Sequence, residues 1–387
     1  MTTKQLDEQY VAHTYARFPV EIVAGKGSLV WDDEGKEYID MGTGIAVNTF
    51  GLADDEWAAA VTAQLSKFQH TSNLYYTAPG AQLAQALCEA TGMKKVFFGN
   101  SGAEANECAI KAARKYAQTT KGEEYYNIIT LKNSFHGRTI TTLAATGQDV
   151  FHTQFTPLTP GFLYADSENP AGLEKLVAEN KVAAIMFEAV QGEGGVLPLP
   201  EDFVRAMADI AQREDILLVA DEVQVGNGRS GALYGYMNLG LAPDIVTTAK
   251  GLGNGLPIGA CMLGEKVADV FAYGDHGSTF GGNPAVCAGA LNVFSRLTEE
   301  MLAGVRERSK LAFETLTGAE GIRSVTGMGL MIGVEPESKT AAEVVAACRD
   351  MGVLVLTAKT KVRLLPALNI PMDQLQKALD VIKEACK

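Results

Sequence analysis

The chain has 387 residues, of which 47% are hydrophobic, and a formal net charge of −13 at pH 7. This length is sufficient for two or three domains with a large core. The negative charge argues against sequence-independent binding to nucleic acid and against binding to anionic membrane surfaces. Because no apolar stretch could span a bilayer and residues 1–9 lack the apolar core of a signal peptide, we expect a soluble cytoplasmic protein.

The spacing of the cysteine and histidine residues argues against a metal site. The six cysteines form no Cys-x-x-Cys pair, and the five histidines form no His-Glu-x-x-His motif. We therefore expect no bound metal. The cysteines should be small buried hydrophobic residues in a reducing compartment.

In chain order, the predicted elements place a long α/β region between two shorter segments. Residues 1–48 are expected to form a short helix and then a hairpin over Val20–Ile39 that turns at residues 32–35. Residues 49–283 alternate between helical and strand patterns, as a parallel sheet requires. The strands predicted in this region are Val96–Phe98, Asn127–Leu131, Val182–Phe187, Ile216–Ala220, Asp244–Thr248 and Ala260–Leu263.

A helix-rich stretch follows Pro284 and leads into a mixed C-terminal segment. It includes a strongly periodic helix over Glu299–Leu316. The later predicted elements are a strand (Met328–Val334), a helix (Ala341–Met351), two strands (Val353–Leu356 and Val362–Leu365) and a helix (Met372–Ala385).

A possible anion site lies before a helix predicted from Ala105. The preceding residues are small, and apolar residues then recur at helical spacing up to Ala117. Ser101 and Glu104 have the spacing of a capping box. Free N–H groups and the helix dipole at such a start favour phosphate. Many helices begin in this way without binding a ligand, so the motif is weak on its own.

Two carboxylates follow a buried strand. Ile216–Ala220 is a run of five apolar residues, which is typical of a strand buried on both faces of a parallel sheet. Asp221 and Glu222 come directly after it, at the carboxyl end where open α/β sheets bind ligands. Taken alone, Asp221 is more simply a loop carboxylate or a helix N-cap.

Lys250 follows the apolar run from Ile245 to Ala249 and precedes the glycine-rich residues 251–259. A lysine at the end of a buried strand is costly unless its charge is removed or used. A desolvated lysine can form a Schiff base with an aldehyde, whereas the simpler alternative is a lysine that extends to water. Asp221 comes 29 residues earlier (250 − 221), which leaves room for a crossover and one further strand, so both could face one crevice.

A phosphate cradle, a carboxylate for a pyridinium nitrogen and a lysine for an aldehyde together indicate pyridoxal 5'-phosphate as the cofactor. The chain resembles the class III, or ω-amino acid, aminotransferases of fold type I. The matching segments run in family order along nearly the whole chain. They are Gly25–Ser28 with Trp31 and Asp32, Asn100–Asn106, Ser134–Thr139, Phe187–Glu188, Gln191–Val196, Asp221–Gln224 with Gly228 and Arg229, Thr248–Leu252, and Ser278–Pro284.

The resemblance implies a fold and an assembly. We expect a large, mostly parallel α/β sheet domain with helices on both faces, and a smaller α+β domain made from both chain ends. The expected boundaries are residues 1–48 and 284–387 for the two parts of the small domain, and 49–283 for the large cofactor-binding domain. The resemblance also implies a homodimer with shared active sites.

The resemblance assigns roles around the cofactor. Lys250 would bind it covalently and act as the general base and acid. Asp221 would pair with the ring N–H, and Gln224 would hydrogen-bond the ring 3-oxygen. Phe135 would stack on the ring, unless it is a plain core aromatic residue. The other expected contacts are Ser101, Gly102 and Ala103 at the phosphate, Glu222 and Val223 beside Asp221, and Thr279 from the second subunit.

Within the family, the chain most resembles the acetylornithine aminotransferases, through residues 44–48 and 70–76 and its compact length. This likeness implies a ping-pong reaction of arginine biosynthesis. Acetylornithine would donate its δ-amino group, N-acetylglutamate 5-semialdehyde would leave, and 2-oxoglutarate would be converted to glutamate.

Charged residues would bind the substrate carboxylates. Arg138, with Ser278 nearby, would bind acetylornithine, and Arg363 would bind the α-carboxylate of 2-oxoglutarate. Glu193 would pair with Arg363 when an amine substrate is bound. The alternative for each charged residue is a surface or interdomain salt bridge.

The chain departs from the family pattern at residues 51–55, where Gly-His and then His-Pro are usual, and at Val225, where Thr is frequent. The loop could change the substrate fit. Two alternative functions stay open: another ω-aminotransferase, using ornithine, succinylornithine, succinyldiaminopimelate or 4-aminobutyrate, and a non-catalytic phosphate-ligand binding protein. The second gives Lys250 and Asp221 no purpose, and Leu256 interrupts its Gly-x-Gly-x-x-Gly pattern.

Overall fold

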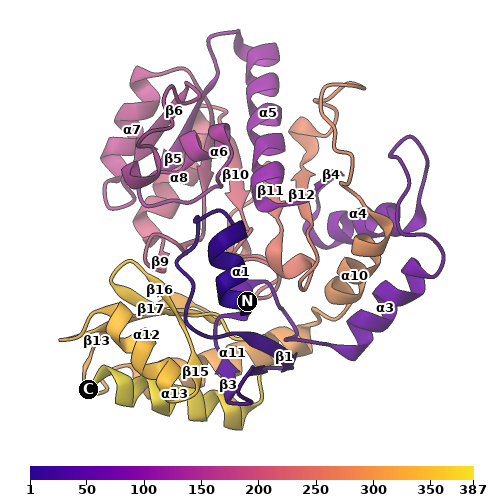
Figure 1. Cartoon of the computed structure of the whole chain (residues 1–387). Helices are drawn as coiled ribbons and strands as arrows, with labels where there is room; N and C mark the ends of the chain where they lie inside the picture. Colours follow the sequence, from indigo (N-terminus) through magenta and orange to yellow (C-terminus); the bar gives the residue numbers. More distant parts are fainter.

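The computed structural model describes residues 1–387 and has a seven-stranded sheet at its centre (Figure 1). The strands are β4 (Lys95–Gly99), β5 (Asn127–Leu131), β6 (Phe162–Ala165), β7 (Val182–Phe187), β10 (Leu217–Asp221), β11 (Ile245–Thr248) and β12 (Gly259–Leu263). Their order is β4-β12-β11-β10-β7-β5-β6, and only β12 runs antiparallel to its neighbours. The expected mostly parallel sheet is confirmed.

Helices cover both faces of this sheet. They are α4 (Ala78–Thr91), α5 (Gly102–Lys121), α7 (Pro170–Glu179), α8 (Glu201–Arg213) and α10 (Pro284–Ser295). Successive strand residues point to opposite faces. In β10, Leu217 and Val219 therefore belong to a core with α5, whereas Leu218 and Ala220 belong to a core with α4, α7, α8 and α10. This double cover explains the uninterrupted apolar sequence of β10.

The two chain ends meet in a second sheet. Its strands, in order, are β1 (Ile22–Lys26), β2 (Leu29–Asp32), β3 (Glu37–Asp40) and β15 (Val353–Leu354). β15 pairs with β3 in parallel, and Figure 1 shows the indigo N-terminal strands beside the yellow C-terminal elements. A third sheet has the order β13 (Ile322–Met328), β14 (Met331–Pro336), β17 (Lys361–Leu364) and β16 (Leu356–Ala358), and a small hairpin joins β8 (Val190–Gln191) to β9 (Leu197–Pro198).

The remaining helices are α1 (Thr3–Tyr10), α2 (Thr43–Ala46), α3 (Asp55–Leu65), α6 (Ile140–Ala145), α9 (Gly235–Asn238), α11 (Glu299–Leu316), α12 (Ala341–Asp350) and α13 (Met372–Cys386). Ile39 and Met41 share one buried core with residues of α11, α12 and α13. This shared core supports our proposal that residues 1–48 and 284–387 form one small domain beside residues 49–283, except that α10 contributes Cys287 and Ala290 to the core of the large sheet. None of the helices has the length and apolar character that crossing a bilayer would require.

Most predicted elements are confirmed to within one or two residues, but four differ. The strand predicted over Val353–Leu356 is divided between β15 and β16, which belong to different sheets. The hairpin predicted over residues 20–39 has a third strand, because Gly27 (φ +59°) allows a turn between β1 and β2. The strand predicted over Met328–Val334 is confirmed only for residues 331–334, which lie in β14, because Gly329 (φ +60°) turns the chain between β13 and β14. The sequence did not predict β6, a short edge strand whose first three residues are only partly buried.

Candidate active site

Two adjacent parallel strands bring Asp221 and Lys250 to one edge of the sheet. β10 pairs with β11 so that Asp221 lies opposite Thr247, and Lys250 comes two residues after the end of β11. Both side chains line a cavity of about 560 Å³ at the carboxyl ends of these strands. This volume lies within the range of small-molecule sites.

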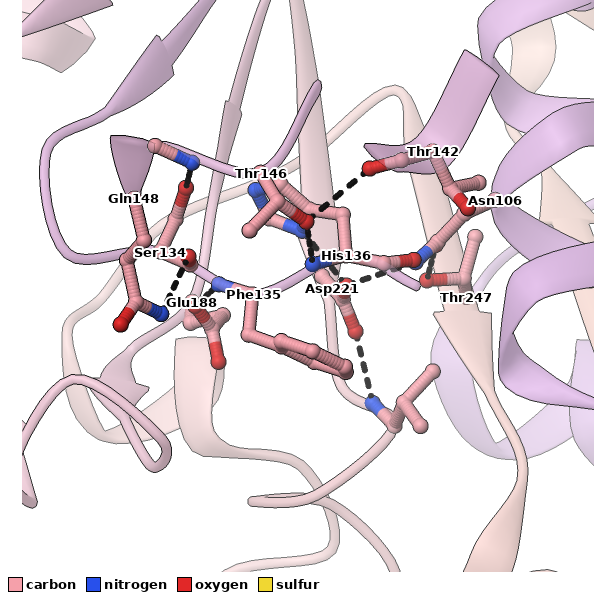
Figure 2. Close-up of polar contacts among 12 residues, drawn as sticks. Asn106, Ser134, Phe135, His136, Thr142, Thr146, Gln148, Glu188, Asp221 and Thr247 are labelled. Carbon is pink, nitrogen blue, oxygen red and sulfur yellow. Dashed lines mark hydrogen bonds and ion pairs between the residues drawn. The ribbon is translucent and has the colours of Figure 1, made fainter. Parts of the chain in front are cut away.

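The buried Asp221 carboxylate is fixed by three groups (Figure 2). Asn106 Nδ2 donates to Oδ2 at 2.8 Å, and His136 Nδ1 lies 2.7 Å from the same oxygen. The backbone N–H of Val223 donates to Oδ1 at 3.0 Å. Asn106 is fixed in turn, because it also donates to the His136 carbonyl at 2.8 Å and accepts from Thr247 at 2.7 Å. Asp221 therefore has the partners that a buried charge requires.

Sequence patterns predicted no role for Asn106 or His136. Asn106 lies on α5 and His136 follows β5, and only folding brings them together beneath Asp221. His136 is 2% exposed and its Nε2 atom has no partner in the chain. The one signal in the sequence was that Asn106 and His136 lie in segments that resemble the family, Asn100–Asn106 and Ser134–Thr139.

Lys250 lines the cavity, and none of its side-chain atoms takes part in a hydrogen bond or ion pair of the chain. Burial lowers the pKa of its ammonium group, although the negative charges of Asp221 and Glu193 oppose this change. A lysine with a lowered pKa is more often neutral, and therefore nucleophilic, near neutral pH.

The start of α5 forms the cavity wall near Lys250. Ser101 accepts a hydrogen bond from the N–H of Glu104 at 3.2 Å, but the Glu104 carboxylate binds Asn100, so the expected capping box is only half formed. The N–H groups of Gly102 and Ala103 have no acceptor in the chain. These free donors at a helix start suit an anion.

Glycine is required at Gly102 because of close packing. A Cβ atom there would lie 2.6 Å from the Val223 side chain, which also lines the cavity. The helix start can therefore approach the end of β10 closely.

Phe135 forms a further wall of the cavity. Its ring contacts Phe151 edge-on with centroids 5.8 Å apart, and the Arg138 guanidinium lies 5.4 Å from its centroid. The backbone N–H of Phe135 donates to Glu188 at 2.9 Å. Burial, together with the charge of Asp221, raises the pKa of Glu188 well above its ordinary value. Glu188 was not among the predicted site residues, although it stands in the motif segment Phe187–Glu188.

Arg363 is buried and paired with Glu193. Arg363 Nη1 donates to Glu193 Oε1 at 2.6 Å and to Gln224 Oε1 at 3.0 Å, and Gln224 lines the cavity. Burial alone would raise the pKa of Glu193, but the charge and hydrogen bond of Arg363 bring it below its ordinary value. Arg363 Nε has no partner, so this arginine retains an unused donor.

Five expected site residues do not line this cavity. Arg363 and Glu193 reach it only through their hydrogen bonds with Gln224, at 3.0 and 3.4 Å. Glu222 points to the start of α9, where its two oxygens accept the N–H groups of Gly235 and Tyr236 at 2.7 Å each. Ser278 and Thr279 line a separate cavity of about 460 Å³. A single chain therefore does not bring Thr279 to Lys250, and its contribution from a second subunit stays a prediction.

The atypical residues 51–55 also lie outside the residues that line the cavity. Asp54 caps α3 by accepting from the N–H of Trp57 at 2.9 Å. Arg296 pairs with both oxygens of Asp54, at 2.7 and 3.0 Å, and lies 3.9 Å from the Phe50 ring centroid. Within one chain, this loop contributes to packing.

The donor set of the main cavity fits pyridoxal phosphate. Lys250 offers an amine without an ion pair, Asp221 offers a buried carboxylate, Gly102 and Ala103 offer free N–H groups, and Phe135 offers an aromatic face. These are the groups that an aldehyde, a pyridine nitrogen, a phosphate and a ring face require.

The aminotransferase class-III family model matches residues 10–386 of the chain. The chain belongs to this family. Class-III aminotransferases depend on pyridoxal phosphate, and this protein is accordingly a pyridoxal-phosphate-dependent aminotransferase.

Individual class-III relatives match over almost their full length. The acetylornithine aminotransferase of Haemophilus ducreyi is 49% identical over 382 residues, covering 98% of this chain and 97% of that protein. That of Caldanaerobacter subterraneus subsp. tengcongensis is 42% identical over 384 residues, with 98% and 97% covered.

Solved structures of related aminotransferases share the fold. An ornithine aminotransferase from Toxoplasma gondii, with partial occupancy of PLP at its active site, matches with a TM-score of 0.94 at 31% identity, covering 99% of this chain and 93% of that chain. The N-acetylornithine aminotransferase of Stenotrophomonas maltophilia matches with a TM-score of 0.84 at 35% identity, covering 98% and 97%.

Glu222 should make the stability of the protein depend on pH. Burial raises the pKa of its carboxyl from 4.5 to about 8. Between these values the folded chain binds a proton that the unfolded chain releases, so the free energy of unfolding should fall as the pH rises from about 5 to about 8. Glu222→Gln cannot titrate and should lose less stability over this range in urea denaturation. If the free energies of unfolding of the variant and the wild type differed by the same amount at every pH in this range, Glu222 would be ionised in the folded as well as the unfolded chain.

Proposed function

We propose that the protein transfers the δ-amino group of N2-acetyl-L-ornithine to 2-oxoglutarate, a step of arginine biosynthesis. The products would be N-acetyl-L-glutamate 5-semialdehyde and L-glutamate. The observation that carries this proposal is the placement of Lys250 and Asp221 in one cavity, with Arg138 on its wall and Arg363 behind Gln224. The acetylornithine aminotransferases at 49% and 42% identity support the choice of amine donor.

Pyridoxal phosphate, when bound, supplies an aldehyde for the amino group and a ring that takes up the electron pair released at the substrate carbon. Asp221 would keep a proton on the ring nitrogen, and Asn106 and His136 would hold Asp221 in place. Lys250 Nζ would remove the proton from the carbon that bears the amino group. The lowered pKa of Lys250 suits a general base near neutral pH.

The two arginines would bind carboxylates at different distances from Lys250. Arg138 is exposed and would bind the carboxylate of acetylornithine, which lies at the far end from the δ-amino group. Arg363 would bind the α-carboxylate of 2-oxoglutarate, beside the reacting carbon. Because Glu193 already pairs with Arg363 at 2.6 Å, an incoming carboxylate would take the place of Glu193.

A homodimer would complete the site. The exposed side chains around the second cavity include Leu74, Tyr75, Tyr76 and Phe280, and an apolar surface of this kind is typical of an interface. The exposed Thr279 would then contact the cofactor phosphate bound in the other subunit, as the family resemblance implies.

A panel of amine donors tests the proposed substrate. Acetylornithine, ornithine, succinylornithine, succinyldiaminopimelate and 4-aminobutyrate would each be assayed with 2-oxoglutarate. We expect the highest kcat/KM for acetylornithine. Ornithine is the second candidate, because an ornithine aminotransferase structure matches with a TM-score of 0.94. A higher kcat/KM for ornithine than for acetylornithine would show that ornithine is the preferred amine donor.

Replacement of the two arginines should separate the two half-reactions. Loss of a charged, bidentate hydrogen bond costs about 1.5–3 kcal/mol, or roughly ten- to a hundredfold in binding. Arg363→Ala should therefore impair the reaction with 2-oxoglutarate far more than the reaction with acetylornithine. Arg138→Ala should impair the acetylornithine reaction, and the oxoacid reaction through its second carboxylate. Single-turnover spectra of each half-reaction provide the measurement, and equal losses for Arg363→Ala would make Arg363 a structural residue.

A further inference from the structure

The backbone at Lys250 has an unfavourable conformation. Its φ angle is +41°, in the left-handed region that residues with a Cβ atom rarely adopt. Such a conformation persists only when the surrounding structure enforces it. At Lys250 the conformation is enforced by hydrogen bonds to the carbonyl groups of its two neighbours, Ala249 and Gly251.

Two buried polar side chains bind these carbonyl groups. Thr49 Oγ1 donates to the carbonyl oxygen of Gly251 at 2.7 Å. Asn227 Nδ2 donates to the carbonyl oxygen of Ala249 at 3.2 Å and to Thr248 Oγ1 at 2.9 Å. Thr49 is 2% exposed and Asn227 is 3% exposed, so water does not compete for these hydrogen bonds.

Close packing leaves little room for the turn to move. A Cβ atom at Gly251 would lie 2.7 Å from Thr49 Oγ1 and 3.4 Å from Asn227 Cβ. The Thr49 carbonyl also accepts from the N–H of Leu368 at 2.9 Å, which connects it to the C-terminal part of the chain. The turn that carries Lys250 is thus held between two segments distant in sequence.

Neither Thr49 nor Asn227 lines the cavity, so neither can contact a ligand there. Their buried side chains have no other use in the site described above. We propose that Thr49 and Asn227 are positioning residues, which hold the backbone of Lys250 in its left-handed conformation and thereby keep the Nζ atom directed into the cavity.

Without these hydrogen bonds, the turn would relax toward the right-handed conformation for part of the time. Lys250 would then spend less time with its amine at the reacting position, and its effective concentration there would fall. The contacts of the cofactor phosphate and ring would be unaffected, since they come from α5, Phe135 and Asp221. Covalent capture of the cofactor should therefore weaken while non-covalent binding is retained.

The test uses the apoprotein and compares Thr49→Ala with Thr49→Ser. Both variants lack the threonine methyl group, and they differ only in the hydroxyl. Stopped-flow absorbance measures the rate at which pyridoxal phosphate is captured covalently, and fluorescence titration measures the Kd of pyridoxamine phosphate, which has no aldehyde. We expect capture to be about three- to tenfold slower in Thr49→Ala than in Thr49→Ser, as for one hydrogen bond. The Kd of pyridoxamine phosphate should be equal in both.

Two further variants complete the design. Asn227→Gly removes the second donor while keeping a residue that tolerates the φ of +54° at this position, and it should also slow capture. Thr130→Ala is the control, because Thr130 is fully buried in β5 and its hydroxyl has no partner. It should leave the capture rate at the wild-type value.

This inference rests on the proposed attachment of the cofactor to Lys250, and Lys250→Ala separates the two. Undiminished covalent capture by Lys250→Ala would overturn the proposed attachment. Equal capture rates for Thr49→Ala, Thr49→Ser and the wild type would overturn the positioning role alone. A loss of pyridoxamine phosphate affinity as large as the loss of capture rate would also overturn it, since that pattern indicates general damage to the cavity.

Discussion

The parallel pairing of β10 with β11 is the constraint on which the rest of the site depends. Parallel strands place their carboxyl ends at the same edge of a sheet, so the residues that follow them converge although 29 positions separate Asp221 from Lys250 (250 − 221). The pairing itself depends on burial, since every residue of both strands is buried. Apolar strands with polar residues at their ends therefore combine a stable core with a reactive edge.

Burial at this edge of the sheet shifts the pKa values of charged groups in directions that suit amino-group transfer. It lowers the pKa of Lys250, which has no ion pair, and it raises the pKa of Glu188, which faces the charge of Asp221. Arg363 and Glu193 offset the cost of burying their charges by pairing with each other. This pair can open when a substrate carboxylate competes for the arginine. Asp221 instead is held by neutral Asn106 and by His136, which keeps its position independent of the substrate.

Local sequence patterns predicted the parallel sheet and the positions of Asp221 and Lys250 at its edge, and the family resemblance implied the other site residues, but neither predicted the contacts between distant segments. The apolar run before Asp221 and the small residues before α5 identified the strand and the helix start, because burial and capping are local properties. The sequence did not predict the role of Asn106 and His136, or the separation of Glu222 from the cavity, because these depend on which way a side chain points after folding. The strand predicted over Met328–Val334 began too early because a glycine turn precedes β14.

The central claim is that Asp221 and Lys250 act together on one cofactor, and Asp221→Asn tests it most directly. An amide cannot keep the ring nitrogen protonated, so the single-turnover rate with acetylornithine should fall by several factors of ten, each worth about 1.4 kcal/mol of transition-state stabilisation. The affinity for pyridoxal phosphate, measured on the same protein, should change much less. A rate near that of the wild type would show that another group serves the ring nitrogen, and would contradict the account.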